Sequence, residues 1–334
     1  MNQFVKLTFT PGLKEVVLQE LKEYILISES EHTISIELPN NFQNILSLKS
    51  INSAYIATSD KKYNPRYLHK HKSILGNLIE KVIIKKEKEF KTFKIRCAGS
   101  QTQEIIEIEK YIQETYTIKK NDVADLEIYI NKIGDDWEIS VRLSPRPLSV
   151  RDYKISNIKG GLNPNIAYAI NTFCNLKNST SYLNIFSGSG TLLIEAGLVN
   201  PHVKLVGLDI DKKTNSLAIQ NIKKAGLIKI IKIKTGDIFE SPDVEKFDVI
   251  TSNLPFGMQI SKGEDLKKLY QQFIDYSEKV LYSKGRLVVY TTEYEILELI
   301  LKNSKFEIVK KLNLKIPTNV NSYLYPRIFV CDLI

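Results

Sequence analysis

The chain has 334 residues, of which 43% are hydrophobic and 25% charged, a globular composition in a chain longer than one ordinary domain. Its net charge is +9, and its longest apolar runs are strand-sized, which argues against a helix that crosses a bilayer. The first residues are polar where a signal peptide has an apolar core, so we expect a cytoplasmic protein.

Up to about residue 150, helical and strand patterns alternate in short units. After Pro11, apolar residues recur at helical spacing, and Phe90–Cys97 alternates apolar and basic residues, which predicts a strand with a cationic face. This mixture predicts an α+β region, which Pro145 and Pro147 end because each removes a backbone donor. The expected elements are helices over 12–24 and Glu104–Tyr116 and strands over Ile34–Leu38, Phe90–Cys97, Leu126–Ile130 and Trp137–Leu143.

Much of the positive charge lies in one segment of this region. From Lys61 to Arg96 there are 12 Lys and Arg residues and 3 acidic residues, a local net charge of +9, so the remainder of the chain is balanced. A basic segment of this kind attracts a polyanion by steering and counterion release, and it favours contact with nucleic acid. A lysine-rich solvated surface is the alternative that charge alone leaves open.

The chain shows no metal-binding pattern. Its three cysteines, Cys97, Cys174 and Cys331, lie far apart in apolar surroundings, and they form neither a CxxC nor a Cys/His spacing. We therefore expect buried thiols, no disulfide framework and no metal site.

From Ser181 onward, strand and helix patterns alternate regularly, which predicts a doubly wound parallel sheet with helices on both faces. The last two strands, over Phe306–Leu314 and Arg327–Leu333, have no helix between them and should pair antiparallel, so the sheet is mixed. The other expected strands are Tyr182–Phe186, Lys204–Asp209, Ile230–Lys234, Phe247–Ser252 and Arg286–Thr291. The expected helices are Leu162–Leu176, with Asn163 as N-cap and Pro164 in the first turn, and Thr191–Leu198, Lys213–Ala225, Leu266–Leu281 and Tyr294–Lys302.

Glycines and acids follow the first three strands of this sheet. Gly188 and Gly190 stand in the first strand-to-helix turn, where the missing Cβ lets the backbone approach a ligand. Asp209 ends the second strand and can accept both ribose hydroxyls of an adenosine, while Asp237 after the third strand lies near the adenine. The third glycine of a dinucleotide fingerprint is missing. Helix capping is the alternative role of the two acids.

The fourth strand is followed by Asn253-Leu254-Pro255-Phe256. An aromatic amine is a poor nucleophile because its lone pair is delocalised into the ring. The Asn253 side-chain oxygen and the Leu254 carbonyl can each accept one amine N–H, which directs the lone pair toward an incoming methyl group. Phe256 offers a ring on which a base can stack. The tetrapeptide predicts methyl transfer to an exocyclic amine, and an ordinary turn is the alternative.

Together, the segments FSGSGTLLIEAG, VGLDID and SNLPFG resemble the motifs of class I methyltransferases that act on exocyclic amines, whose acceptor motif is [DNS]-P-P-[YFW]. More narrowly, FKIRCAGSQ, WEISVRLS and RDYKISNIKGGLNPNIAYAI resemble the THUMP-domain-containing tRNA guanine-N2 methyltransferases. This resemblance implies S-adenosylmethionine as cofactor and the tRNA acceptor stem as substrate. It also implies a ferredoxin-like segment over 1–65, a THUMP domain over 66–147 and a Rossmann-like methyltransferase domain over 148–334.

The resemblance also assigns the site residues. The loop that contacts the methionine and ribose is expected to contain Phe186, Gly188, Ser189, Gly190 and Thr191, the ribose acid is Asp209, and the adenine pocket contains Asp237 and Ile238. The acceptor motif is Asn253, Leu254, Pro255 and Phe256, and Asn253 is also expected to contact the cofactor. Two positions depart from the family pattern. Asn184 replaces an acid near the cofactor's ammonium group, which should weaken binding, whereas Leu254 replaces a proline that contributes only its carbonyl.

The primary prediction is methylation of guanosine N2 in tRNA by a monomer. Lys94, Arg96, Arg146 and Arg151 are the expected phosphate contacts. The alternatives are N2 of guanine in rRNA, N6 of adenine, an amine of DNA or of a protein glutamine, and a non-catalytic RNA-binding protein, to which Asn184 is the one feature that points. The sequence selects neither the modified nucleotide nor one methyl over two.

Overall fold

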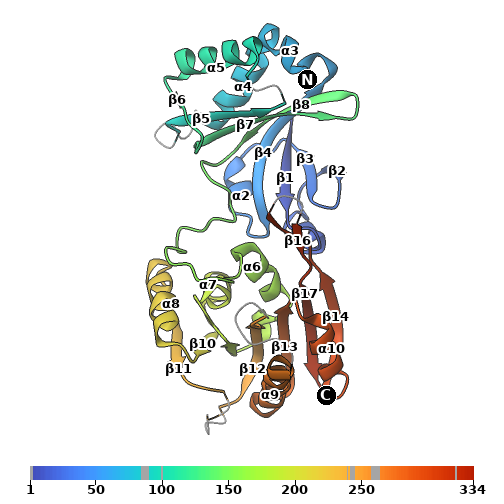
Figure 1. Ribbon diagram of the computed structural model, residues 1–334, viewed down its shortest axis with the longest axis vertical. Coiled ribbons are helices and arrows are strands. Elements are labelled where there is room, and N and C mark those ends of the chain that lie inside the picture. Colours follow the sequence, from blue (N-terminus) through green and yellow to red (C-terminus); the bar gives the residue numbers. More distant parts are fainter. Residues whose placement is uncertain are drawn as a thin grey trace. The chain divides into compact units, whose positions relative to one another are not determined.

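The computed structural model describes residues 3–83, 90–98, 101–238, 240, 245–256, 264–319 and 322–334. The chain divides into two compact units (Figure 1). The N-terminal unit comprises Met1–Phe9 and Val17–Ser149, and the C-terminal unit comprises Thr10–Val16 and Val150–Ile334. Part of the basic segment, residues 84–89, and Gly257 after the acceptor motif lie outside the described residues.

The N-terminal unit is built on one eight-stranded sheet in the order β2-β3-β1-β4-β8-β7-β5-β6. Its strands are β1 (Phe4–Phe9), β2 (Leu26–Glu29), β3 (Thr33–Glu37), β4 (Ile51–Asp60), β5 (Thr92–Cys97), β6 (Lys119–Lys120), β7 (Leu126–Ile133) and β8 (Asp136–Arg142). Its helices are α2 (Phe42–Leu46), α3 (Pro65–Leu68), α4 (Lys72–Ile83) and α5 (Gln103–Tyr116), and the boundary between the two units falls within α1 (Lys14–Glu20).

Amphipathic helices cover a face of this sheet. α3, α4 and α5 lie on one side of it in Figure 1, and α4 buries Leu75, Leu78, Ile79 and Val82, the spacing of a helix with one apolar stripe. β4 pairs with β8 over six residues, so strands from before and after residue 65 form one continuous sheet. The predicted boundary between a ferredoxin-like segment and a THUMP domain therefore falls inside a single compact unit.

The C-terminal unit contains a seven-stranded sheet in the order β11-β10-β9-β12-β13-β17-β14. Its strands are β9 (Ser181–Ile185), β10 (Lys204–Asp209), β11 (Ile231–Thr235), β12 (Phe247–Asn253), β13 (Leu281–Thr291), β14 (Phe306–Asn313) and β17 (Arg327–Leu333), with β15 (Ile316–Asn319) and β16 (Ser322–Leu324) as a separate hairpin. The first five strands of the order are parallel, and β17 pairs antiparallel with β13 and β14. The predicted Rossmann-like sheet with an antiparallel last strand is confirmed.

Helices pack on both faces of this sheet. One apolar cluster contains buried residues of α6 (Pro164–Thr172), α7 (Thr191–Val199) and α8 (Lys212–Lys224), and a second contains those of α9 (Glu264–Val280) and α10 (Tyr294–Leu301). The expected helix over 162–176 is shorter, but it begins as predicted, because the Asn163 side chain accepts a hydrogen bond from the Asn165 N–H and Pro164 occupies the first turn. Within the described ranges, each helix is too short or too polar to traverse a lipid bilayer.

Candidate active site

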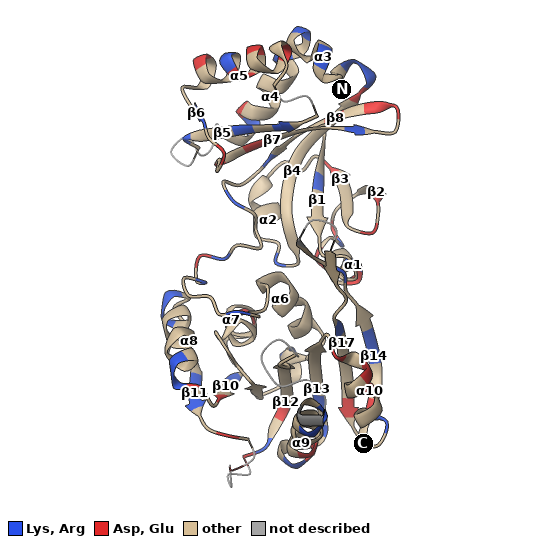
Figure 2. Ribbon diagram, viewed as in Figure 1, with Lys and Arg blue, Asp and Glu red and all other residues tan. Residues whose placement is uncertain are grey.

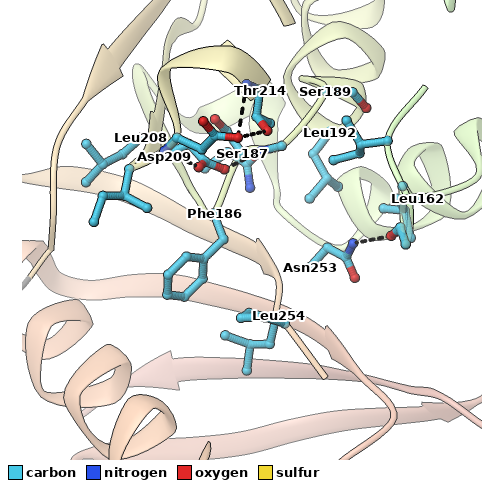
Figure 3. Close-up of a pocket in the computed structure, with 18 of the residues that line it drawn as sticks. Leu162, Phe186, Ser187, Ser189, Leu192, Leu208, Asp209, Thr214, Asn253 and Leu254 are labelled. Carbon is cyan, nitrogen blue, oxygen red and sulfur yellow. Dashed lines mark hydrogen bonds between the residues drawn. The ribbon is translucent and has the colours of Figure 1, made fainter. Parts of the chain in front are cut away.

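A cavity of about 670 Å³ opens at the carboxyl edge of the parallel strands in the C-terminal unit (Figure 3). Asp209 and Asn253 approach it from different strands, so the expected ribose acid and the expected amine acceptor share one space. Gly190 is not among its lining residues, but it starts α7 and turns the loop. The predicted residues that line the cavity are Phe186, Gly188, Ser189, Thr191, Asp209, Asp237, Ile238, Asn253, Leu254, Pro255 and Phe256.

The loop after β9 is tightly turned. Phe186, Gly188 and Gly190 all have positive φ, at 54°, 53° and 79°, a region that glycine enters without strain and phenylalanine rarely does. A Cβ on Gly188 would lie 2.9 Å from the Ile158 side chain. Gly188 therefore lets the loop pass close to the segment that contains Ile158, whereas a Cβ on Gly190 would instead lie 3.4 Å from the Ala218 side chain.

Backbone N–H groups orient the carboxylate of Asp209. One of its oxygens accepts a hydrogen bond from Gly188 N at 2.9 Å, and the other accepts one from Asp211 N at 3.0 Å. The Asn215 side chain donates to the Asp209 carbonyl and to the Thr235 hydroxyl, which ties the ends of β10 and β11 together. Each carboxylate oxygen keeps a lone pair, so the group can still accept the two hydroxyls of a ribose.

The acceptor motif is held by its neighbours on both sides. The Asn253 amide nitrogen donates to the carbonyl of Gly160 at 3.3 Å, and because a carbonyl cannot donate, the amide oxygen must point the other way. Leu254 N donates to the Tyr290 carbonyl at 3.0 Å. The hydroxyl of Tyr270 donates to the Pro255 carbonyl at 2.9 Å.

Burial raises the pKa of Tyr270 well above its ordinary value, so its hydroxyl keeps the proton that it donates. The hydroxyl of Thr291 lies 2.7 Å from the Tyr270 oxygen and accepts a hydrogen bond from Glu293 N at 3.0 Å. Thr291 therefore donates to Tyr270, and a directed chain of hydrogen bonds runs from the end of β13 to Pro255.

Three polar atoms of the cavity wall are buried and have no hydrogen-bond partner among the described residues: Asn184 Oδ1, Ser187 Oγ and Asn253 Oδ1. Buried polar groups are normally paired, so such atoms fit a ligand that brings its own donors. Asn184 is fixed because its amide nitrogen donates to the Thr251 carbonyl at 3.0 Å. Its oxygen can therefore accept from an ammonium group although it lacks the charge of a carboxylate.

The segment Ile158–Leu162 also lines the cavity, although it is not among the predicted site residues. The Ser156 backbone is held by the Asn221 side chain through two hydrogen bonds of 3.0 Å. Gly160 has a φ of 75° and accepts the hydrogen bond from Asn253. The adjacent pair Gly160-Gly161 was the signal in the sequence that could have identified this segment.

The expected phosphate contacts differ in their surroundings. Lys94 forms a 2.8 Å ion pair with Asp122, and Arg96 forms a 2.7 Å ion pair with Glu127. Both cations lie on β5 of the N-terminal unit, and Figure 2 shows Lys and Arg of this strand in blue. Arg146 is exposed. The side chain of Arg151 is only 10% exposed and pairs with Glu195, which is fully buried, so Arg151 is not an exposed cation that could contact a phosphate as predicted. No cluster of potential metal ligands occurs among the residues that the structure describes.

A family model described as "UPF0020: RMKL-like, methyltransferase domain" matches residues 151–321, just over half of the chain. The chain belongs to this family. The matched methyltransferase domain starts beside the first residue of the main segment of the C-terminal unit, Val150, and contains every residue of the predicted cofactor and acceptor sites.

Curated relatives of this methyltransferase domain carry names of RNA guanine-N2 methyltransferases. The chain is 33% identical over 172 residues to the U6 snRNA (guanine-N(2))-methyltransferase THUMPD2 of Bos taurus, a match that covers 51% of the chain and 32% of that protein. It is 24% identical over 259 residues to the tRNA (guanine(6)-N2)-methyltransferase of Methanocaldococcus jannaschii, covering 65% and 67%. The chain thus spans about a third of the bovine relative's length.

Among solved structures, TrmN from Thermus thermophilus has the same fold, with a TM-score of 0.79 and 19% identity over 99% of this chain and 100% of that one. The fold of both units is therefore found in a solved protein of similar length.

Proposed function

We propose that the protein transfers a methyl group from S-adenosylmethionine to the exocyclic N2 amine of a guanosine in RNA, with tRNA as the substrate. The observation that carries this proposal is the unpartnered oxygen of Asn253 in the same cavity as Asp209. The names of the relatives, which specify guanine N2 in tRNA and in U6 snRNA, support the choice of amine and of RNA. We also propose that this enzyme is cytoplasmic and monomeric.

The cavity contains residues that could contact the ribose, the adenine and the methionine part of the cofactor. Asp209 would accept the ribose hydroxyls, and Asp237 and the buried Ile238 would border the adenine. The oxygens of Asn184 and Ser187 would accept from the ammonium of the methionine part. When bound, this cofactor supplies an electrophilic methyl group on a positively charged sulfur.

The acceptor motif prepares the amine for transfer. The Asn253 side-chain oxygen and the Leu254 carbonyl accept one N–H each, which turns the nitrogen lone pair toward the methyl group. On gaining the methyl group that the cofactor would supply, the nitrogen would release one of the two protons that these oxygens accept. Phe256 stacks on the base, and Tyr270 holds the Pro255 carbonyl so that the backbone of the motif keeps its direction.

The RNA would also contact the N-terminal unit, which we propose to contain a ferredoxin-like segment and a THUMP domain. Exposed cations there include Arg96, whose side chain is 44% exposed despite its pairing, and most of the described basic segment that starts at Lys61. Their charge favours a polyanion without selecting a sequence. Lys94, Arg96 and Arg146 remain the proposed phosphate contacts.

The test is a transfer assay with cofactor labelled in its methyl group and unmodified transcripts of tRNA, U6 snRNA and an rRNA fragment. We expect label in N2-methylguanosine from tRNA after digestion to nucleosides. Replacing Asn253 by Ala should lower kcat about 100-fold because one amine acceptor is lost, while RNA binding is unchanged. Label in N6-methyladenosine, or none with any RNA, would contradict the proposal, and label in another RNA would redirect it.

A further inference from the structure

A short hairpin leaves the sheet of the C-terminal unit at the carboxyl edge of the parallel strands. Because the cavity opens at this edge, we call it the catalytic edge. The last residue of β14, Asn313, pairs with the first residue of β17, Arg327, which also pairs with Thr291 at the end of β13. The chain between β14 and β17 therefore extends beyond the edge at which the parallel strands end, as β16 does in Figure 1. We define the edge hairpin as β15 and β16 with the flanking residues Lys315 and Tyr325.

This hairpin ends close to the acceptor motif, where the chain enters β17. Asn253 pairs with Tyr290 on β13, and Tyr290 pairs with Ile328 on β17. Adjacent strands lie about 4.8 Å apart, so the start of β17 is roughly 10 Å from Asn253 across the sheet. A nucleotide next to one in the active site is within reach of the chain that enters β17.

Two tyrosines of the edge hairpin expose their rings side by side. Tyr323 lies on β16, and Tyr325 follows this strand directly. Their ring centroids are 6.4 Å apart, and the two residues are 47% and 56% exposed. The ammonium of Lys315 lies 4.6 Å from the centroid of the Tyr323 ring. Exposed aromatic rings beside a cation form the kind of surface on which nucleic-acid bases stack.

The charge of this part of the chain favours a polyanion. Between Glu307 and Asp332 there is no acidic residue. The basic residues in this interval other than Lys315 pair with glutamates elsewhere in the unit: Lys310, Lys311 and Arg327. Lys315 pairs with no acid among the described residues, so its charge is available to a phosphate.

We propose that the edge hairpin binds an unpaired nucleotide of the RNA, adjacent to the target guanosine. Tyr323 and Tyr325 stack on its base, and Lys315 contacts its phosphate. This inference rests on the proposed function, because it assumes an RNA whose target base enters the cavity. Stacking reads no particular base, so the hairpin would hold the strand near the active site whatever nucleotide adjoins the target.

Direct contact is tested by fluorescence. The chain contains one tryptophan, Trp137, in the N-terminal unit, so Tyr323→Trp adds a second reporter that still stacks. Titrating the full chain with an unmodified tRNA transcript should quench the additional emission of this variant. The matched control is Tyr282→Trp, at a residue 50% exposed near the start of β13, at the opposite end of that strand from the catalytic edge, where no quenching beyond that of the wild type is expected.

Turnover gives the second measurement. The double variant Tyr323→Ala/Tyr325→Ala should raise KM for tRNA about tenfold, the loss expected for one stacked base, while kcat and the Kd for S-adenosylmethionine stay within twofold. Lys315→Gln should weaken RNA binding less at high salt than at low salt, because a phosphate contact is screened. Tyr282→Ala serves as the control and should leave KM unchanged.

The outcomes separate the two proposals. RNA binding without quenching at position 323, or a double variant with the KM of Tyr282→Ala, overturns the edge-hairpin contact and leaves the proposed function standing. Quenching by RNA without methyl transfer overturns the proposed function, and with it the adjacent target guanosine, and leaves only a contact between the hairpin and RNA. A chain that does not bind RNA overturns both.

Discussion

At the scale of single residues, the site depends on which atom of each side chain faces the cavity. Asn253 donates from its nitrogen to Gly160, so its unpartnered oxygen is the atom that we propose to accept from a substrate amine. Asp209 is oriented in the same way by two backbone N–H groups. The protein thus fixes the orientation of both groups, and it leaves the oxygen of Asn253 and one lone pair on each oxygen of Asp209 for a ligand.

Replacing Asp209 by Asn should weaken cofactor binding. One carboxylate oxygen becomes an N–H₂ group that faces a backbone N–H, at Gly188 or at Asp211, and a charge-assisted acceptor for the ribose is lost. Hydrogen bonds to charged groups contribute about 1.5–3 kcal/mol, so calorimetry should show a Kd for S-adenosylmethionine at least about tenfold higher. The exposed Asp275 on α9 is the control, and equal Kd values for Asp209→Asn and Asp275→Asn would contradict the assignment.

Replacing Tyr270 by Phe should lower kcat about tenfold. The Pro255 carbonyl loses its donor, so the backbone of the acceptor motif is held less firmly. We expect the transition state to lose about 1.4 kcal/mol of stabilisation, which corresponds to a tenfold lower rate. Because Tyr270 is not among the residues that line the cavity, the Kd for S-adenosylmethionine should stay within twofold. The same substitution at the exposed Tyr282 provides the comparison. A change in Kd without a change in kcat would show that Tyr270 supports the fold alone.

At the scale of elements, the starts of β9 and β12 are joined by one carboxylate. Asp248 Oδ2 accepts hydrogen bonds of 2.8–3.0 Å from the backbone N–H and the hydroxyl of both Thr180 and Ser181. Burial of Asp248 acts to raise its pKa, but these four hydrogen bonds outweigh burial and hold the pKa below the ordinary value of 3.8.

A lowered pKa makes the contribution of Asp248 to stability dependent on pH. The ionised form is bound more tightly in the folded chain, so its contribution is complete above the unfolded pKa and is lost as pH falls through the folded pKa. The difference in free energy of unfolding between the wild type and Asp248→Ala should therefore be larger at about pH 6 than at about pH 3. Denaturant titrations would measure it, with Asp275→Ala as control. A difference that does not vary with pH would refute the assignment.

Elements with a regular pattern were predictable, and those without one were not. β9, β10 and β12 are apolar runs bounded by turn residues, and their ends were predicted within one residue. β13 begins five residues earlier than predicted because the register shifts between Phe247 and Val249 of its neighbour, and the irregular residues 282–285 look like a loop in the sequence. β4 was missed because it is buried on both faces and does not alternate.

At the scale of the whole molecule, the sequence predicted the sheet and the contents of the site better than the connections between them. The sequence reveals the turn glycines, the two acids and the acceptor motif because the chemistry expected of them requires particular residue types. The segment Ile158–Leu162 reaches the cavity only through tertiary hydrogen bonds such as those of Asn221, which no local pattern reveals. Arg151 looked like a surface cation, and only its burial beside Glu195 shows otherwise.

The division of the chain into units is interleaved rather than sequential. Residues Thr10–Val16 belong to the C-terminal unit, where Leu13 and Val16 are fully buried in the same apolar cluster as Leu312 and Leu314. The Lys315 N–H also donates to the Pro11 carbonyl. During synthesis, this segment must wait for β14 and Leu314, which follow it far along the chain. The C-terminal core therefore closes only after Leu314 has been synthesised, and a ribosome stalled before residue 312 would leave Leu13 and Val16 without these partners.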